Sequence, residues 1–297
     1  MLFATLVLVA VLGTRSSTPQ TFQHVADGPP PVLLPTGRLE QAYEFARDAT
    51  VRIDERCATA QGEATLGMGT GFFVSAEGLV LTAYHVVDTA SRPAGCDPHF
   101  VAVTPERSEY DLELVGFDAY MDLAMLQASV DRSMPFVRPA TRAPTPGSPV
   151  VAVGNSRNDF LQPRAGEVTR LGVHAGRADF ADNTMELTNS LAPGDSGGPV
   201  INERGEVVGV VSYISFNPGA MSSDSYVPPF LRGVALPRRF ASYAVPVFDD
   251  ASLISALAAG EKRDVPVVGF SWRQGMDYDP GSSDVYLGRR PGTIVVT

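Results

Sequence analysis

Short apolar or alternating segments recur from about residue 50 onward, and turn-forming residues separate them at nearly regular intervals. Examples are GTGFFV, GLVLTAYHVV, DLAMLQA, SPVVAVGN and GEVVGVVSYI. This spacing is typical of a β-sandwich or a β-barrel. No repeat of roughly 20–50 residues is visible, which disfavours a propeller or a solenoid. The pattern therefore predicts an all-β domain.

Two segments have the periodicity of a helix instead. RLEQAYEFARDA, which begins at Arg38, combines helix-forming residues with spaced apolar positions. DDASLISALAAGEK (249–262) begins with acids that can cap a helix and ends near a glycine. The proline-rich stretch 27–37 predicts an extended linker before the first helix.

The first residues contain an apolar run, Leu2–Leu12, that is too short to span a bilayer comfortably. The run suits the apolar region of a secretory signal, although no basic residue precedes it and no clear cleavage site follows it. A buried strand or an uncleaved anchor is the alternative. The sequence favours export, with a signal peptide or anchor over 1–20 and a linker with a short helix over 21–45.

Composition and charge narrow the classes of function. Hydrophobic residues at 44% and charged residues at 19% are ordinary for a soluble globular protein, and 297 residues suffice for one large domain or two modest ones. The net charge of −10 argues against nucleic acid or an anionic membrane as partner, because no basic stripe is available to neutralise phosphates.

Cys57 and Cys96 are the two cysteines of the chain. In an exported protein they could close a loop of roughly 40 residues, which would stabilise the fold by about 3–4 kcal/mol. Two separate buried thiols are the equal alternative. Two cysteines without paired histidines argue against a structural zinc site, so no metal or cofactor is predicted.

The segment NSLAPGDSGGPV (189–200) gathers small residues around Ser196. A serine hydroxyl becomes a nucleophile only with a base, a group that orients the base, and donors for the developing oxyanion. Small neighbours let the backbone turn sharply, so the N–H groups of Gly194 and Ser196 can point to one spot. The following VINERGEVVGVV predicts a hairpin rather than a helix, so the nucleophile elbow of α/β-hydrolases fits poorly.

A base and an orienting acid are available upstream. His85 lies in LVLTAYHVVD, at the end of a predicted strand, where a scaffold can present a side chain. The remaining histidines, in a linker or in polar loops, are His24, His99 and His174. Asp122 directly precedes the predicted strand DLAMLQ, and Asp111 and Asp118 are the alternatives to it.

Four segments in this order and spacing resemble the chymotrypsin-like serine proteases: GTGFFVSAEGLVLTAYHVV, GFDAYMDLAMLQ, VVAVGN and LAPGDSGGPVINERGEVVGVVS. They are most similar to the HtrA/Deg branch, and the resemblance extends from about Thr50 to Gly260. It implies two six-stranded antiparallel β-barrels with a C-terminal helix and an active site in the cleft between the barrels. The protease domain is accordingly expected over 46–260, followed by a C-terminal extension over 261–297.

The resemblance also implies roles for single residues. His85 matches the family's general base, Asp122 its orienting acid and Ser196 its nucleophile, while Gly194 and Ser196 match the backbone donors of the oxyanion hole. The implied activity is hydrolysis of peptide bonds in proteins through an acyl-enzyme. A catalytically silent binding protein on the same scaffold is the alternative, but such proteins usually lose a member of the triad or a flanking glycine.

Ser190, Ser212 and Ile214 match the lining of the family's primary substrate pocket. Ser190, six residues before the nucleophile, carries no carboxylate, which disfavours Arg or Lys as the P1 residue. Ile214 stands where open pockets have glycine. The resemblance thus predicts a small or medium apolar P1 residue.

The sequence departs from the HtrA/Deg pattern in two places. The nucleophile is preceded by Asp195 instead of asparagine, and residues 261–297 are too few for the PDZ domain that usually follows. In trypsin-type zymogens the matching acid pairs with a new N-terminal amine, but DATVRIDERC offers no activation sequence. We therefore expect Asp195 to pair internally, with an arginine as a candidate partner, and no proteolytic activation.

Overall fold

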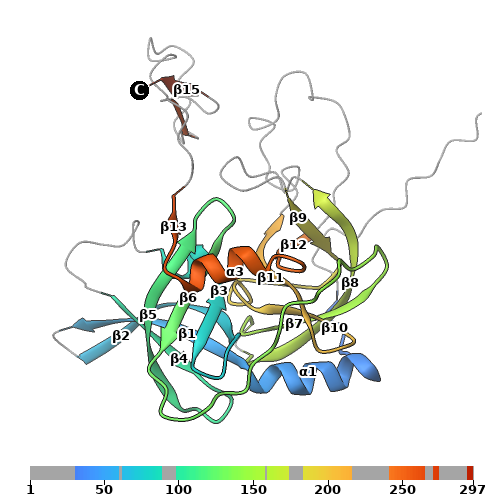
Figure 1. Cartoon of the computed structure of the whole chain (residues 1–297), viewed down its shortest axis with the longest axis horizontal. Coiled ribbons are helices and arrows are strands. Elements are labelled where there is room, and N and C mark those ends of the chain that lie inside the picture. Colours follow the sequence, from blue (N-terminus) through green and yellow to red (C-terminus); the bar gives the residue numbers. More distant parts are fainter. Residues whose placement is uncertain are drawn as a thin grey trace, which may run out of the picture.

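The computed structural model describes residues 31–59, 62–88, 98–157, 159–173, 183–215, 241–264, 270–273 and 293–296. Within these ranges the chain forms two β-barrels that lie side by side, with a helix along the bottom in the view of Figure 1. The predicted signal segment 1–20 lies outside the described residues. Among the described helices, none is long and apolar enough to cross a membrane.

The first barrel contains the strands that come first in the chain. They are β1 (Thr50–Thr59), β2 (Gly62–Phe73), β3 (Leu79–Thr82), β4 (His99–Val103), β5 (Glu109–Asp118) and β6 (Leu123–Ala128). Their order is β5-β4-β1-β2-β3-β6, and pairing of β5 with β6 closes the ring. A short strand, β13 (Lys262–Arg263), adds to β5 in parallel.

The second barrel closes in the order β10-β11-β12-β9-β8-β7. Its strands are β7 (Pro149–Gly154), β8 (Gln162–Val173), β9 (Thr184–Leu187), β10 (Pro199–Asn202), β11 (Val207–Ser215) and β12 (Ala241–Pro246). The predicted hairpin is β10 with β11. Every pairing within the two rings is antiparallel, so the expected pair of six-stranded antiparallel barrels is confirmed.

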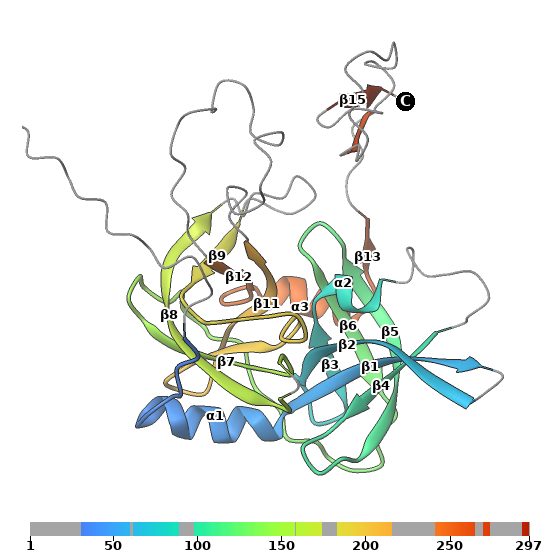
Figure 2. The same cartoon turned by 180° about the vertical axis from the view of Figure 1, so that it is seen from behind.

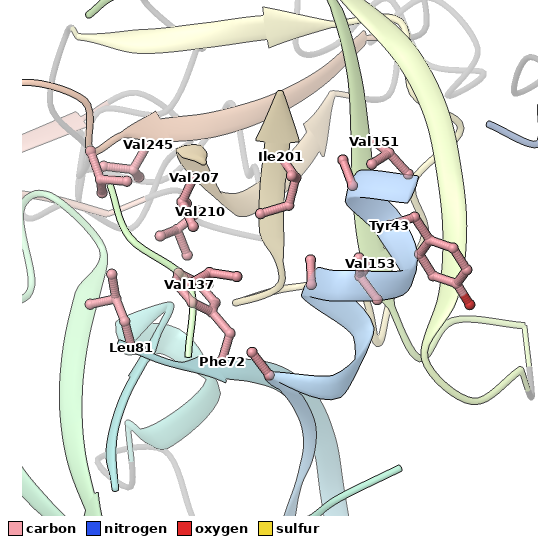
Figure 3. Packing of buried hydrophobic residues seen from close by; sticks show 14 of the residues in the cluster. Tyr43, Phe72, Leu81, Val137, Val151, Val153, Ile201, Val207, Val210 and Val245 are labelled. Atoms are coloured by element: carbon pink, nitrogen blue, oxygen red, sulfur yellow. The ribbon is translucent and has the colours of Figure 1, made fainter. Parts of the chain in front are cut away.

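Three apolar clusters hold the barrels together. One fills the first barrel, with Val51 and Ile53 of β1 pointing inward on alternate positions, and one fills the second barrel. The third cluster joins them, because Phe72 and Leu81 of the first barrel pack in the same core as Val210 of the second (Figure 3). Burying each such side chain stabilises the fold by about 1.5–3 kcal/mol, so the barrels are fixed relative to each other by packing.

The two predicted helices are both present. The helix α1 (Arg38–Asp48) packs against β7 and β10 through its apolar face, and Figure 3 shows Tyr43 on this helix. The Tyr43 hydroxyl donates to the Leu161 carbonyl at 3.0 Å. The helix α3 (Ala251–Ala258) follows β12 and packs against β5 and β6, so the chain returns to the first barrel. Its predicted acidic cap is Asp250, whose carboxylate accepts the Leu253 N–H at 3.1 Å.

The structure also shows a pair of strands near the end of the chain and a disulfide at Cys57. Two short strands of the C-terminal extension, β14 (Phe270–Arg273) and β15 (Thr293–Val296), pair in antiparallel fashion. Cys57 is disulfide-bonded, and the one other cysteine of the chain, Cys96, lies outside the described residues.

Candidate active site

Both barrels contribute side chains to one site where they meet. His85 lies on α2 (Tyr84–Val87), a short helix that follows β3 directly, and Asp122 ends the turn from β5 to β6. Ser196 lies in the loop before β10, and Ser212 lies on β11 of the second barrel. Figure 2 shows α2 and β6 in the first barrel and β11 in the second. The sequence predicts His85 at the end of a strand, but the strand β3 ends at Thr82 and the helix α2 begins at Tyr84, one residue before His85.

The His85 imidazole is held by a buried carboxylate. Its Nδ1 lies 2.9 Å from Oδ2 and 3.1 Å from Oδ1 of Asp122, and the His85 main-chain N–H donates to Oδ1 at 3.0 Å. Asp122 is 1% exposed, whereas the His85 side chain is 39% exposed. Because an ionised carboxylate can only accept, Nδ1 carries the ring proton of the neutral imidazole and Nε2 keeps a free lone pair.

The local backbone explains why Asp122 reaches this position. Asp122 has a left-handed φ of 55°, which aspartate tolerates better than most residues, and its carbonyl accepts the Tyr84 N–H at 3.1 Å. Asp118 accepts the Met121 N–H at 2.8 Å and so shapes this turn. Asp111 is exposed on β5. Neither alternative acid is hydrogen-bonded to His85, which leaves Asp122 as its acid partner within the described chain.

Ser212 connects the acid with the serine loop. Its buried hydroxyl donates to Asp122 Oδ2 at 2.5 Å, and its carbonyl is 3.4 Å from the Ser196 hydroxyl. Among the described residues, His85 Nε2 makes no hydrogen bond to Ser196. The bond from Ser196 to Ser212 is long and weak, and a hydroxyl rotates freely, so the Ser196 proton is not committed to it.

The serine loop presents two main-chain donors. Gly194 has a φ of 104°, and a Cβ there would meet the Asn155 carbonyl at 2.9 Å, so the position needs glycine. The adjacent Asp195 and Gly197 N–H groups donate to backbone carbonyls of Ala192 and Val211. The Gly194 and Ser196 N–H groups, by contrast, donate to no acceptor within the described part of the chain.

Asp195, which lies between Gly194 and Ser196 in this loop, is 0% exposed. Its Oδ1 accepts the Ser156 N–H and its Oδ2 accepts the Ala192 N–H, both at 3.0 Å. Burial raises the pKa of the carboxyl, while the hydrogen bonds from Ser156 and Ala192 and the charge of Arg164 act to lower it. Asp195 therefore pairs internally, with Ser156 and the Ala192 N–H; Arg164 acts on it through its charge and is itself hydrogen-bonded to Ser156.

Of the residues expected to line the substrate pocket, Ser190 has described surroundings, whereas the side chain of Ile214 does not. Ser190 is buried, and the Arg157 guanidinium donates to its carbonyl at 2.8 Å and to its hydroxyl at 3.1 Å. Ile214 belongs to β11, but its side chain lies outside the described part. The sequence analysis does not predict a role for Arg157. The pattern there shows only a charged residue shortly after VVAVGN.

Of the remaining candidate histidines, only His99 belongs to the described residues. His99 is exposed and lies 3.1 Å from Glu63, and His24 and His174 lie outside the described residues. Within the described ranges no group of three His, Cys, Asp or Glu side chains could hold a metal ion.

Part of the chain is similar in sequence to known serine proteases. Residues 69–210 match the model of the trypsin-like peptidase domain family. Over 166 residues the chain is 34% identical to a probable periplasmic serine endoprotease DegP-like of Marinomonas sp., an alignment that covers 54% of this chain and 33% of that protein. It is 32% identical over 149 residues to a putative serine protease HhoA of Synechocystis sp., covering 48% and 36% respectively.

A solved structure shows the same fold. The crystal structure of the serine endoprotease from Yersinia pestis superposes with a TM-score of 0.53 at 24% identity, over 76% of this chain and 66% of that one. The chain spans about a third of the length of the two curated relatives named above. It contains a trypsin-like peptidase domain and is homologous to the DegP-like and HhoA serine proteases of the HtrA/Deg branch.

Proposed function

We propose that this protein is a serine endopeptidase in which Ser196 is the nucleophile, His85 the general base and Asp122 the residue that orients the base. The observation that carries the proposal is the Asp122 carboxylate, which binds His85 Nδ1 on one side and the Ser212 hydroxyl on the other. This arrangement leaves the basic lone pair at Nε2, on the exposed part of the ring.

The reaction proceeds in two halves. The Ser196 hydroxyl oxygen attacks the peptide carbonyl while its proton moves to His85 Nε2, and the C–N bond breaks as the same proton passes to the leaving amine. The Ser196 ester that remains is hydrolysed by water, whose proton again passes through Nε2 to the serine oxygen. In both halves the oxyanion accepts hydrogen bonds from the Gly194 and Ser196 N–H groups.

Asp122 does not take the proton. It stabilises the imidazolium that forms during each half-reaction and holds the ring in one tautomer. Its near-complete burial strengthens this effect, because a charge interaction is screened less in a low-dielectric setting.

For the substrate we propose a small or medium apolar P1 residue. Ser190 offers no carboxylate, and the Arg157 guanidinium on its hydroxyl adds positive charge at the expected pocket floor. That charge opposes Lys and Arg. A peptide-library profile tests this: apolar P1 residues are expected, acidic ones would mean that Arg157 determines the preference, and basic ones would contradict the proposal.

The domain limits and the location are part of the proposal. We assign the protease domain to 46–260 and the C-terminal extension to 261–297, with protein or peptide substrates. We also propose export, because the DegP-like relative of Marinomonas sp. is described as periplasmic. Edman sequencing of the protein recovered from a producing cell tests whether the segment 1–20 is removed.

Proteolysis by the full chain tests the activity itself. Purified wild type is expected to degrade unfolded casein, and the Ser196→Ala variant is expected to lose at least about 10³-fold in rate. A folded wild type that binds casein without cleaving it would favour a catalytically silent binding protein.

A further inference from the structure

We infer that Thr70, on β2 of the first barrel, is a positioning residue for the oxyanion hole formed by the serine loop of the second barrel. Its hydroxyl donates to the Gly194 carbonyl at 2.7 Å, and its main-chain N–H donates to the Ser196 carbonyl at 2.8 Å. The inference rests on the proposed function, since it assigns the loop's shape to a residue that touches no substrate.

Asn155 determines where the Thr70 proton points. The Asn155 Nδ2 donates to Thr70 Oγ1 at 2.9 Å, and its Oδ1 accepts the Leu161 N–H at 3.1 Å. A reversed amide would place two donors against each other at Leu161, so the amide orientation is fixed. Because Asn155 already occupies an acceptor site of the hydroxyl and its NH₂ cannot accept, the single hydroxyl proton goes to the Gly194 carbonyl.

Gly194 needs such a restraint. It has a positive φ of 104° and lacks a side chain, so its own conformational preferences do not hold one orientation. The Gly194 N–H is one of the two proposed oxyanion donors, and its direction changes when the peptide groups around this residue rotate. A bond to the Gly194 carbonyl from outside the loop limits that rotation.

The same residue connects the base with the nucleophile. The Thr82 hydroxyl donates to the Thr70 carbonyl at 2.7 Å, and Thr82 ends the strand that leads into α2 and His85. On the other side, a Cβ at Gly197 would overlap both the Thr70 carbonyl oxygen and the Thr82 hydroxyl oxygen. The serine loop is thus in direct contact with the first barrel at Thr70, one residue from the nucleophile.

Burial makes these bonds effective. Thr70 is 0% exposed and Asn155 is 3% exposed. When a buried partner is removed, water cannot replace it, and the remaining polar atoms stay unpaired. Loss of the Thr70 hydroxyl would leave both the Gly194 carbonyl and the Asn155 Nδ2 without this partner.

The test compares three variants of the full chain. Thr70→Val keeps the shape and the main-chain N–H but removes the hydroxyl, and we expect kcat to fall about 10- to 100-fold with KM changed less than about threefold. Thr70→Ser restores the hydroxyl and is expected to stay within about threefold of wild type. Thr50→Val is the matched control, because Thr50 is equally buried and donates to the Ala46 carbonyl at 2.7 Å, away from the site.

Amide hydrogen exchange of the peptide that covers 189–197 provides a readout independent of activity. Faster exchange in Thr70→Val than in Thr50→Val supports the inference even if wild type shows no activity that depends on Ser196, an outcome that would refute the proposed function alone. Unchanged exchange together with kcat within twofold of wild type would overturn the role of Thr70. A loss of kcat that Thr70→Ser does not rescue would overturn it as well.

Discussion

The site contains two buried carboxylates with different kinds of partner. Asp122, in the first barrel, is hydrogen-bonded to two side-chain groups, the ring of His85 and the hydroxyl of Ser212, and it also accepts the His85 main-chain N–H. Asp195, in the second barrel, accepts the main-chain N–H groups of Ser156 and Ala192, and the Ser156 side chain also hydrogen-bonds to it. Exposure does not distinguish them, at 1% and 0%.

The difference in partners indicates that one carboxylate takes part in the reaction and the other maintains the structure of the loop. An imidazole can gain and lose a proton at neutral pH, so in the proposed mechanism the carboxylate bonded to it responds to the reaction. Asp195 has no such partner: main-chain N–H groups and a serine side chain keep their protons at neutral pH, so this carboxylate serves to hold the loop that contains Gly194 and Ser196. Substitutions at the two acids are therefore expected to have different consequences.

Asp122→Asn is expected to have the largest effect on activity. The NH₂ of the new amide can only donate, so His85 Nδ1 accepts from it and the ring proton moves to Nε2. In this tautomer Nε2 has no lone pair with which to take the proton of Ser196. We expect kcat to fall about 10⁴-fold with the melting temperature nearly unchanged. Asp118→Asn is the control and should stay within about threefold, since the amide oxygen can still accept the Met121 N–H. Equal losses in the two variants would contradict the assignment of Asp122.

Asp195→Ala is expected to reduce stability and activity together. The change leaves the Ser156 and Ala192 N–H groups unpaired in a buried space, at a cost of about 2–4 kcal/mol in the free energy of unfolding. Urea unfolding measures this cost, and kcat is measured on the folded fraction. A variant as stable as wild type but inactive would show that Asp195, like Asp122, acts in the reaction. That result would contradict the structural role given to Asp195.

Ser212→Ala is expected to have a smaller effect, confined to activity. It removes the hydroxyl that donates to Asp122 but keeps the main-chain carbonyl that faces Ser196. A hydrogen bond to a charged group contributes about 1.5–3 kcal/mol, so kcat should fall about tenfold or somewhat more. An unchanged kcat would show that the Ser212 hydroxyl is not needed to hold Asp122 in place.

The smallest expected effect is in the pH dependence of stability. Burial raises the pKa of Asp195 above its ordinary value of 3.8, so the native state binds this proton more tightly than the unfolded state. The resulting contribution to stability is fully present below 3.8 and is lost as the pH rises through the native pKa. The stability of wild type relative to Asp195→Asn should therefore decrease from acidic to neutral pH, and a constant difference would contradict it.

Much of the fold could be predicted from the sequence. Alternating apolar segments and turn residues indicated the strands, the acid before Ala251 indicated the cap of α3, and the residues before β10 indicated a serine loop followed by a hairpin. These features are local, because period, capping and turn chemistry act over a few residues. Resemblance to a known family was needed to specify two closed barrels.

The rest depended on contacts between distant parts of the chain. Thr70 and Asn155 are 85 residues apart, and nothing in GTGFF or VVAVGN shows that their side chains meet. The partners of Asp195 were predicted only as internal, with arginine as a candidate, because backbone donors leave no mark on residue type. Arg157 was missed for the opposite reason: a charged residue in a polar loop is usually solvated, and only the fold brings it to Ser190.

Covalent labelling with a fluorophosphonate, located by mass spectrometry, is the decisive test of Ser196 as the nucleophile. The reagent reacts with serines that a base activates and an oxyanion hole accommodates. We expect one label per chain on Ser196, absent in Ser196→Ala and slowed strongly in Asp122→Asn but little in Asp118→Asn. A folded wild type that takes no label, or takes it on another serine, would contradict the assignment of Ser196, His85 and Asp122 as the catalytic site.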